Sequence, residues 1–315
     1  MSLFFCAEEE TEGHGCNSRN KEREASEKMK SHCILAGIDF GSDTEKIVSY
    51  AAYFSAKTKS SVRLLYVIDY LLTPPTYLMP YIEEEQKRDE EELQRWKAVL
   101  EKQGISSDAR IMMGRLHESF LKAIKESSPD LMVIGYQSHA FRQSSSERLI
   151  KSIEMPMLVV RGPRADMQGS LAVKKILCAV DFSDNAQKAL TTALDYAQAF
   201  SADLHVIHSI PSHTIKSRWA IWEAIGKIDK DAFDKQMQAE AEAELSRMVK
   251  KSGIQHSAEV LHGNPAEIIC ARAEEGGYDL VVMGARGLSY IQGLLIGSTT
   301  EAVLRSSFCP VLIVH

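Results

Sequence analysis

The sequence lacks the features that mark nucleic-acid binders, membrane proteins and secreted proteins. Lys and Arg number 37 against 43 Asp and Glu, so the net charge is -6 and the basic excess typical of nucleic-acid binders is missing. No apolar run approaches the ~18 residues of a membrane-spanning helix. Leu3, Phe4 and Phe5 form only a short apolar run before three glutamates, which is unlike a secretory signal. We therefore expect a cytoplasmic protein with no nucleic-acid or membrane partner.

Common cysteine and catalytic motifs are also missing. The six cysteines contain no Cys-x-x-Cys pair and are scattered over 315 residues, which argues against a disulfide framework. The sequence has no Gly-x-Ser-x-Gly elbow and no His-Glu-x-x-His motif, and Gly293–Thr299 lacks the lysine of a Walker A loop. His205 and His208 lie three apart on an expected strand and would face opposite sides, so they do not predict a shared metal.

The chain repeats itself. The matching segments, in pairs, are Cys33–Phe40 with Lys175–Phe182, Asp130–Gly135 with Asp279–Gly284, and Met155–Val160 with Cys309–Val314. Three matches in the same order mean that one unit is used twice. We therefore predict two domains, 32–162 and 174–315, joined by a linker at 163–173. Residues 1–31 are rich in Glu, Lys, Ser and Asn and are typical of a flexible tail.

Each copy alternates short apolar runs, typical of strands buried on both faces, with helical patterns. The expected strands are 33–39, 61–68, 108–113, 130–135 and 156–161, then 175–181, 202–209, 256–262, 278–284 and 310–315. The expected helices are 43–58, 81–103, 116–127 and 145–153, then 184–200, 229–252, 264–275 and 298–307. Asp184 and Asn264 are expected as N-caps, and Pro265 suits a first helical turn. This order predicts two Rossmann-like or flavodoxin-like α/β domains, each a five-stranded, mostly parallel sheet with helices on both faces.

A glycine-rich segment follows the fourth expected strand of the second copy. Its skeleton is Gly284, two residues, Gly287, nine residues, then Gly297 and Ser298. Ligands of open α/β sheets bind beyond the carboxyl ends of the strands. A helix that starts with small hydroxyl residues offers free N–H groups to a phosphate there. Asp181, after the first strand, can accept a ribose hydroxyl, hold a metal, or simply hold the loop that follows its strand.

Together with the Val180–Ser183 strand end and the closing strand Cys309–Val314, this spacing resembles the universal stress protein family in its tandem form, over about 32–315. The resemblance implies that the second domain binds ATP or a related adenine nucleotide, with Mg²⁺ accompanying the phosphates. Ser209 departs from the family, which usually has an apolar residue there. The residues that the resemblance implies at the nucleotide are Ala179, Val180, Asp181 and Ser209 near the base and ribose, Met283, Gly284, Arg286 and Gly287 around the sugar and phosphates, and Gly297, Ser298 and Thr299 at the phosphates.

The first copy departs from this pattern. Gln143 and Ser144 stand at the positions of the last glycine and the serine, and Ser138 stands where the second glycine is expected. We therefore expect a degenerate phosphate loop, with weak nucleotide binding or none. The alternative is an anion held by Arg142, Ser144 and Ser145, because hydroxyl and N–H groups at a helix start favour anions.

The leading hypothesis for function, taken from the resemblance, is a stress-response regulator whose nucleotide state sets its shape or its partners. A ligand-free interaction scaffold and a slow ATPase are the alternatives. Apart from Asp181, no base or nucleophile converges on the loop, so we expect no dedicated enzyme. The apolar edge Pro310–Val314 calls for a partner strand. In the family the last strand pairs with its counterpart, so we expect an intramolecular pseudo-dimer, with a homodimer and an unidentified protein partner left open.

Overall fold

The computed structural model describes residues 32–69, 79–136, 145–161, 171–211, 230–251, 257–288 and 295–315. The expected tail and residues 163–170 of the expected linker lie outside the described residues. We call the part before this linker repeat 1 and the part after it repeat 2. No helix among the described residues is long and apolar enough to cross a membrane.

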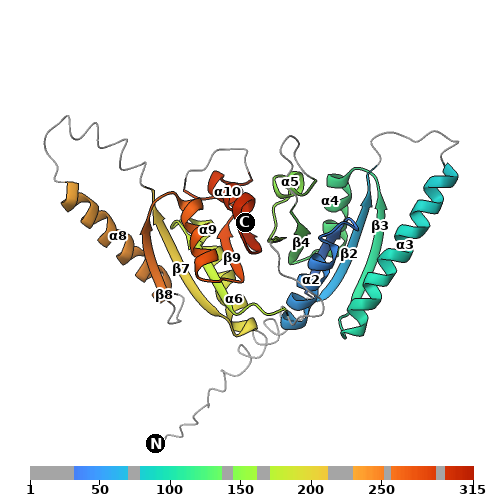
Figure 1. Cartoon of the computed structure of the whole chain (residues 1–315), viewed down its shortest axis with the longest axis horizontal. Coiled ribbons are helices and arrows are strands. Elements are labelled where there is room, and N and C mark those ends of the chain that lie inside the picture. Colours follow the sequence, from blue (N-terminus) through green and yellow to red (C-terminus); the bar gives the residue numbers. More distant parts are fainter. Residues whose placement is uncertain are drawn as a thin grey trace, which may run out of the picture.

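The elements follow the predicted order, and their ends differ from the predicted ends by at most three residues (Figure 1). Repeat 1 comprises β1 (Cys33–Ile38), α2 (Thr44–Thr58), β2 (Ser61–Ile68), α3 (Met79–Lys102), β3 (Ser107–Met113), α4 (Leu116–Ser127), β4 (Leu131–Gly135), α5 (Ser145–Ile150) and β5 (Met157–Val160). Repeat 2 comprises β6 (Lys175–Val180), α6 (Asp184–Phe200), β7 (Asp203–Ile210), α8 (Lys230–Lys251), β8 (Ser257–His262), α9 (Pro265–Glu275), β9 (Leu280–Gly284), α10 (Ser298–Ser306) and β10 (Val311–Val314).

The ten strands form one sheet, in the order β3-β2-β1-β4-β5-β10-β9-β6-β7-β8. Within each repeat all neighbouring strands are parallel, and the order 3-2-1-4-5 is that of the first five strands of a Rossmann fold rather than that of flavodoxin. β10 pairs with β5 in the antiparallel sense, with Leu312 opposite Leu158. The apolar edge at the end of the chain is therefore covered by the corresponding strand of repeat 1.

Helices cover both faces of this sheet, because side chains along a buried strand point alternately to either side. On one face α2, α3, α6 and α8 pack over a core that includes Ala36 and Val282. On the other face α4, α5, α9 and α10 pack over a core that includes Leu35 and Val281. Both cores run through both repeats, since residues of β5 and β10 belong to each.

An aromatic cluster holds α2 against α6 where the repeats meet. The ring of Phe54, which is fully buried, lies 4.9 Å from that of Phe200 and 5.0 Å from that of Tyr196. Tyr53 packs on the same Phe200 ring at 5.0 Å, and its hydroxyl accepts the backbone N–H of Val173. The contact between the repeats is thus made by aromatic packing as well as by strand pairing.

Two helix starts in repeat 2 test the capping predictions. Asn264 caps α9 by accepting the N–H of Ala266, and Pro265 occupies the first turn, both as predicted. The prediction of Asp184 as the cap of α6 was wrong. Ser183 is the N-cap and accepts the N–H of Ala186, so Asp184 is the first helical residue. An acidic residue there still suits the positive end of the helix dipole.

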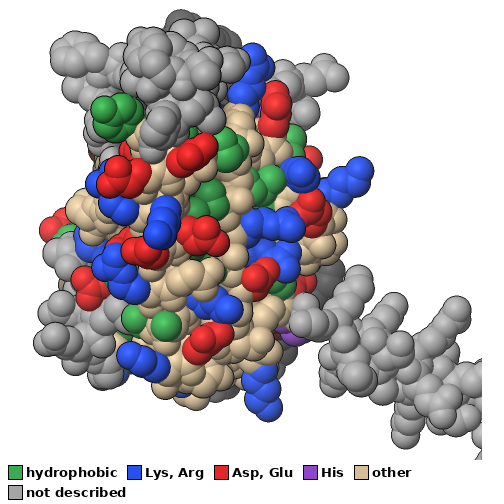
Figure 2. Space-filling model, turned by 90° about the vertical axis from the view of Figure 1, so that its right-hand side faces the viewer, with side chains coloured by type: hydrophobic (Ala, Val, Ile, Leu, Met, Phe, Trp, Pro, Cys, Tyr) green, Lys and Arg blue, Asp and Glu red, His purple; other side chains and the backbone are tan. Residues whose placement is uncertain are grey.

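The outer end of repeat 1 carries α3 and β3 (Figure 1). Figure 2 views this end and shows acidic and basic side chains interspersed over it. The glutamate-rich stretch of α3 is exposed, with Glu83, Glu84 and Glu85 facing solvent, while Leu93 and Leu100 are buried. This acidic run is therefore the wet face of a helix.

Candidate functional site

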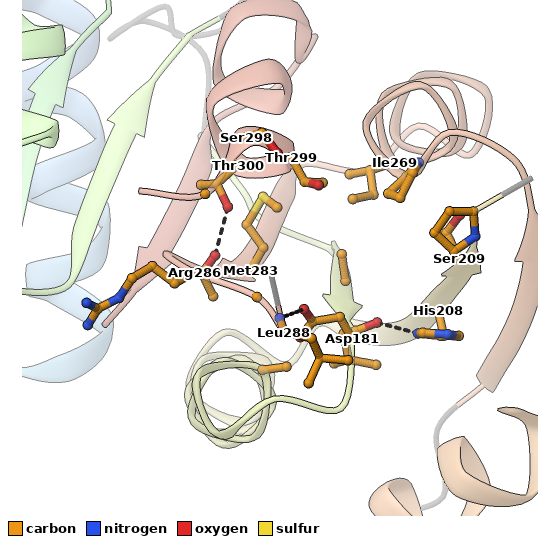
Figure 3. A pocket seen from close by; sticks show the side chains of 18 of the residues that line it. Asp181, His208, Ser209, Ile269, Met283, Arg286, Leu288, Ser298, Thr299 and Thr300 are labelled. Carbon is orange, nitrogen blue, oxygen red and sulfur yellow. Dashed lines mark hydrogen bonds between the residues drawn. The ribbon is translucent and has the colours of Figure 1, made fainter. Parts of the chain in front are cut away.

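A pocket of about 510 Å³ opens at the carboxyl ends of the strands in repeat 2 (Figure 3). β6 lies between β7 and β9. The helix after β6 (α6) packs on one face of the sheet and the helix after β9 (α10) packs on the other. Open α/β sheets bind ligands at such a switch point. The volume is in the usual range for a small-molecule site. Every residue predicted for the site lines this pocket, including Asp181, Ser209 and Gly297.

One part of the pocket is apolar. Ala179, Ile207 and Met283 lie near the carboxyl ends of their strands, and Ile269 of α9 and Ile296 line the same part. These five side chains are buried in the core under α9 and α10, so the wall is rigidly packed. A wall of this kind suits a flat apolar ring.

Another part of the pocket is formed by the start of α10. Gly297 is its N-cap, and Ser298 and Thr299 follow. Gly297 donates its N–H to Ala285 at 2.8 Å, and the Thr300 hydroxyl donates to the Gly284 carbonyl at 2.9 Å (Figure 3). These bonds hold the helix start beside the loop that follows β9. The first N–H groups of a helix have no partner within the helix and carry partial positive charge, which favours an anion.

Asp181 holds the loop after β9. One carboxylate oxygen accepts the N–H and the hydroxyl of Ser183, at 3.2 and 2.6 Å, and the other accepts the N–H of Leu288 at 2.8 Å. A Cβ at Gly287 would collide with the second oxygen, which explains the glycine there. The sequence left open whether Asp181 holds its loop or meets a ligand. The structure shows the loop contacts, and the ribose contact stays a prediction.

His208 lines the pocket but was not among the site residues predicted from the sequence, which considered it only as a metal ligand. Its Nδ1 lies 2.8 Å from the Val180 carbonyl, and its ring stacks on Phe182 with centroids 4.2 Å apart. Burial lowers the pKa of His208, against the opposing effects of the Val180 bond and Asp181. The ring is therefore neutral at pH 7, with the proton on Nδ1, because only a protonated nitrogen bonds to a carbonyl. The sequence could have indicated His208 as a site residue, because it lies near the carboxyl end of β7, where ligands of such sheets bind.

The side chains of Ser209 and Arg286 bind other parts of the protein rather than face the pocket freely. The Ser209 hydroxyl donates to the Gly263 carbonyl at 3.2 Å, which fixes it to the loop before α9. The backbone of Arg286 lines the pocket, but Figure 3 shows its side chain leaving it. Its Nη2 lies 2.9 Å from the Glu154 carboxylate in repeat 1. The predicted contact of Arg286 with a sugar or phosphate therefore requires its guanidinium to move.

Glu301, in the first turn of α10, also lines the pocket and was not predicted. Its carboxylate accepts Lys151 of repeat 1 at 2.8 Å and Arg305 at 2.7 Å. The Lys151 bond holds the pKa of Glu301 below its ordinary value, with Arg305 acting in the same sense and partial burial opposing it. Repeat 1 thus contacts the pocket of repeat 2 at two places, through Glu154 and Lys151. The remaining lining residues missed from sequence are Ala186, Ile207, Pro211, Pro265, Ile269, Leu288, Ile296 and Thr300.

The corresponding place in repeat 1 is built differently. Tyr136 follows β4 where Ala285 follows β9, and its hydroxyl donates to the buried Glu147 at 2.9 Å. Arg161 lies over the Tyr136 ring at 4.7 Å. Burial, helped by Glu147, raises the pKa of Tyr136 to about 12. The anion-binding alternative rests on Arg142, Ser144 and the side chain of Ser145, which lie outside the described residues. Ser138 and Gln143, on which the degenerate loop was predicted, lie outside them as well.

The histidines of the outer strands make local contacts. His205 lies 2.5 Å from the Ser257 hydroxyl through Nδ1 and 3.1 Å from the Glu259 carboxylate through Nε2. His262 contacts Gln238 at 2.6 Å. In the part of the chain that the structure describes, no group of three His, Cys, Asp or Glu side chains is placed to hold a metal ion.

Comparison with known proteins gives a consistent match. The model of the "Universal stress protein family" matches residues 31–161 and 172–315. Universal stress protein Slr1230 of Synechocystis sp. is 27% identical over 311 residues, which cover 89% of this chain and 98% of that protein. Universal stress protein MJ0531 of Methanocaldococcus jannaschii is 31% identical over 148 residues, covering 46% of this chain and 84% of that protein.

A solved structure has the same fold over nearly the whole chain. The crystal structure of a universal stress protein from Archaeoglobus fulgidus matches with a TM-score of 0.65 and 24% identity. The match covers 90% of this chain and 96% of that one, so it includes both repeats.

Proposed function

The chain belongs to the universal stress protein family, and from this premise we propose that its second repeat binds ATP or a related adenine nucleotide. The protein then acts as a cytoplasmic stress-response regulator rather than as a dedicated enzyme. One observation carries the proposal: the residues that the family resemblance implies at a nucleotide line a single pocket at the switch point of the sheet.

The pocket fits the two ends of a nucleotide. The apolar wall of Ala179, Ile207, Ile269 and Met283 suits an adenine ring, and the start of α10 suits its phosphates. Gly284 also lines the pocket, where a Cβ would lie 3.1 Å from the backbone of Asn185, so close packing against α6 accounts for the glycine.

Mg²⁺ would be held by the phosphates of the ligand. Asp181 and Glu301 are the carboxylates that line the pocket, and both already accept hydrogen bonds from this chain. Mg²⁺ commonly keeps several waters and binds through substrate phosphates, so it does not need a protein cage here.

The regulator is favoured over the ATPase by the contacts of Asp181. Hydrolysis needs a group that orients the attacking water. Asp181 is committed to Ser183 and Leu288, which leaves it poorly placed for that role. The scaffold alternative draws support from the pairing of β5 with β10, and we propose that the two repeats act as an internal pseudo-dimer whether or not a ligand is bound.

The experiment begins with the nucleotide content of the full chain, purified without added nucleotide, denatured and analysed by chromatography. Titration calorimetry with ATP, AMP and cAMP, with and without Mg²⁺, then measures affinity. Gly297→Val is the test variant, because a Cβ there meets nothing closer than 3.6 Å and the fold should persist. The methyl groups of the valine would occupy the place proposed for the phosphates at the start of α10, which we call the phosphate seat.

We expect about one adenine nucleotide per chain, and loss of binding in Gly297→Val. The melting temperature of this variant should match that of the wild type freed of nucleotide, because a bound ligand itself raises the melting temperature. A wild-type chain that neither releases nor binds a nucleotide would favour the scaffold. Unchanged binding in Gly297→Val would show that the ligand sits elsewhere.

A further inference from the structure

We propose that Glu154 of repeat 1 sets the affinity of the repeat 2 pocket for phosphorylated ligands, by competing with them for Arg286. Glu154 is then a specificity-determining residue that lies outside the pocket and in the other repeat. This inference rests on the nucleotide binding proposed above.

The charges around the pocket carry the argument. Arg286 is the one Lys or Arg among the described residues that line it, whereas Asp181 and Glu301 are both acidic. The guanidinium of Arg286 lies outside the pocket, 2.9 Å from the Glu154 carboxylate (Figure 3). In this arrangement the wall presents helix N–H groups to a phosphate but no cationic side chain.

Arg286 is within reach of the phosphate seat. Its Cα lies 3.7 Å from the position that a Cβ on Gly297 would take, and Gly297 is the N-cap of α10. An arginine side chain is longer than this separation. The length of the side chain therefore allows a change of rotamers to carry the guanidinium from Glu154 to the start of α10.

When a phosphate is present, Arg286 gains more by binding it than by keeping its pair with Glu154. The Glu154 side chain is 57% exposed, and partly exposed ion pairs contribute little. Arginine binds phosphate through stronger, often bidentate, charge-assisted hydrogen bonds. Breaking the Glu154 pair nevertheless opposes ligand binding, by up to about five-fold in affinity.

The contact runs in one direction only. When the repeats are aligned through β4 and β9, and through β5 and β10, Arg286 corresponds to Gln137 and Glu154 corresponds to Phe308. A symmetry-related ion pair on repeat 1 is therefore impossible. Repeat 1, whose loop is degenerate, supplies the negatively charged Glu154. Repeat 2, which has the glycine skeleton, supplies the positively charged Arg286.

A second contact acts in the opposite sense. Lys151 donates to Glu301 at 2.8 Å and offsets the negative charge of that carboxylate beside the phosphate seat. Removal of Lys151 leaves more negative charge facing the phosphates and weakens their binding. Removal of Glu154 takes away the carboxylate that competes for Arg286 and strengthens phosphate binding. Two changes at one interface thus have opposite effects, which a general loss of fold cannot produce.

The test is titration calorimetry of the full chain with ATP and with adenosine, which lacks phosphates. Glu154→Gln should tighten ATP binding by up to about five-fold and leave adenosine unchanged. Lys151→Gln should weaken ATP binding. Arg286→Gln should also weaken it, and Glu154→Gln should have no effect when added to Arg286→Gln. Glu118→Gln is the matched control, because Glu118 forms an exposed pair with Arg115 on α4.

The inference is overturned if Glu154→Gln weakens ATP binding, since Glu154 would then position Arg286 rather than compete for it. It is also overturned if Glu154→Gln matches Glu118→Gln, or changes adenosine and ATP equally. In these cases the wild-type chain still binds ATP, and the proposed function stands. A wild-type chain that binds neither ligand removes the proposed function and this inference together.

Discussion

Asp181→Asn tests whether the loop after β9 must be held in place for the site to work. The carboxylate accepts hydrogen bonds on both oxygens, from Ser183 on one and from Leu288 on the other. An asparagine has only one oxygen, so its NH₂ group faces the donor of either Ser183 or Leu288 and that hydrogen bond is lost. Losing a hydrogen bond to a charged acceptor costs about 1.5–3 kcal/mol, and partial exposure places this case near the lower figure.

The expected result follows from that figure. If the loop must be ordered to bind a nucleotide, about 1.5 kcal/mol appears as roughly ten-fold weaker ATP binding. Amide hydrogen exchange should be faster at Leu288 in the same variant. Asp39→Asn is the matched control, because Asp39 holds the equivalent turn of repeat 1 through Gly41. It should change neither measurement in repeat 2.

Two results would refute the reasoning. Unchanged ATP binding in Asp181→Asn would mean that the loop need not be held. Weaker binding without faster exchange at Leu288 would mean that Asp181 contacts the ligand directly, as the resemblance implies for the ribose.

The remaining predictions concern stability. Phe54→Ala should cost about 4 kcal/mol and speed hydrogen exchange in α6 of the other repeat, because Phe54 packs on Phe200; Phe120→Ala, buried within repeat 1, should leave α6 protected. Slow exchange of α6 in Phe54→Ala would contradict this coupling. Burial lowers the pKa of His315 to about 4, so its native contribution is present above pH 6.5 and lost as pH falls towards 4. His315→Gln should therefore flatten the decline in melting temperature over that window, and an unchanged decline would exclude His315 as its source.

Sequence reasoning recovered most of the architecture because the relevant signals are local or repeated. Short apolar runs and helical periodicity place the elements, and three repeated segments reveal the two units. The choice between Rossmann and flavodoxin order needed the structure, since it depends on which strands pair. The cap of α6 was missed by one residue, because Ser183 and Asp184 are both good caps and adjacent.

The parts of the site that depend on the local backbone were predicted from the sequence. The parts that depend on side-chain partners far away in the chain were missed. Glycine spacing and a helix start place Gly284, Gly287 and Gly297 in the pocket. The direction of Arg286 depends on Glu154, more than a hundred positions earlier in the chain, and no local pattern shows that partner. His208 was missed for a similar reason, since its role rests on Val180 in a neighbouring strand.

The pairing of β5 with β10 also changes how the two halves can diverge. In a symmetric dimer of identical chains, each substitution appears on both sides of the interface. Here the two sides are parts of one chain, so each can change alone, as Glu154 and Phe308 have done. Because the partner strand is tethered, dilution does not separate the halves. Covalent linkage therefore lets one half specialise as a controller of the other without a loss of assembly at low concentration.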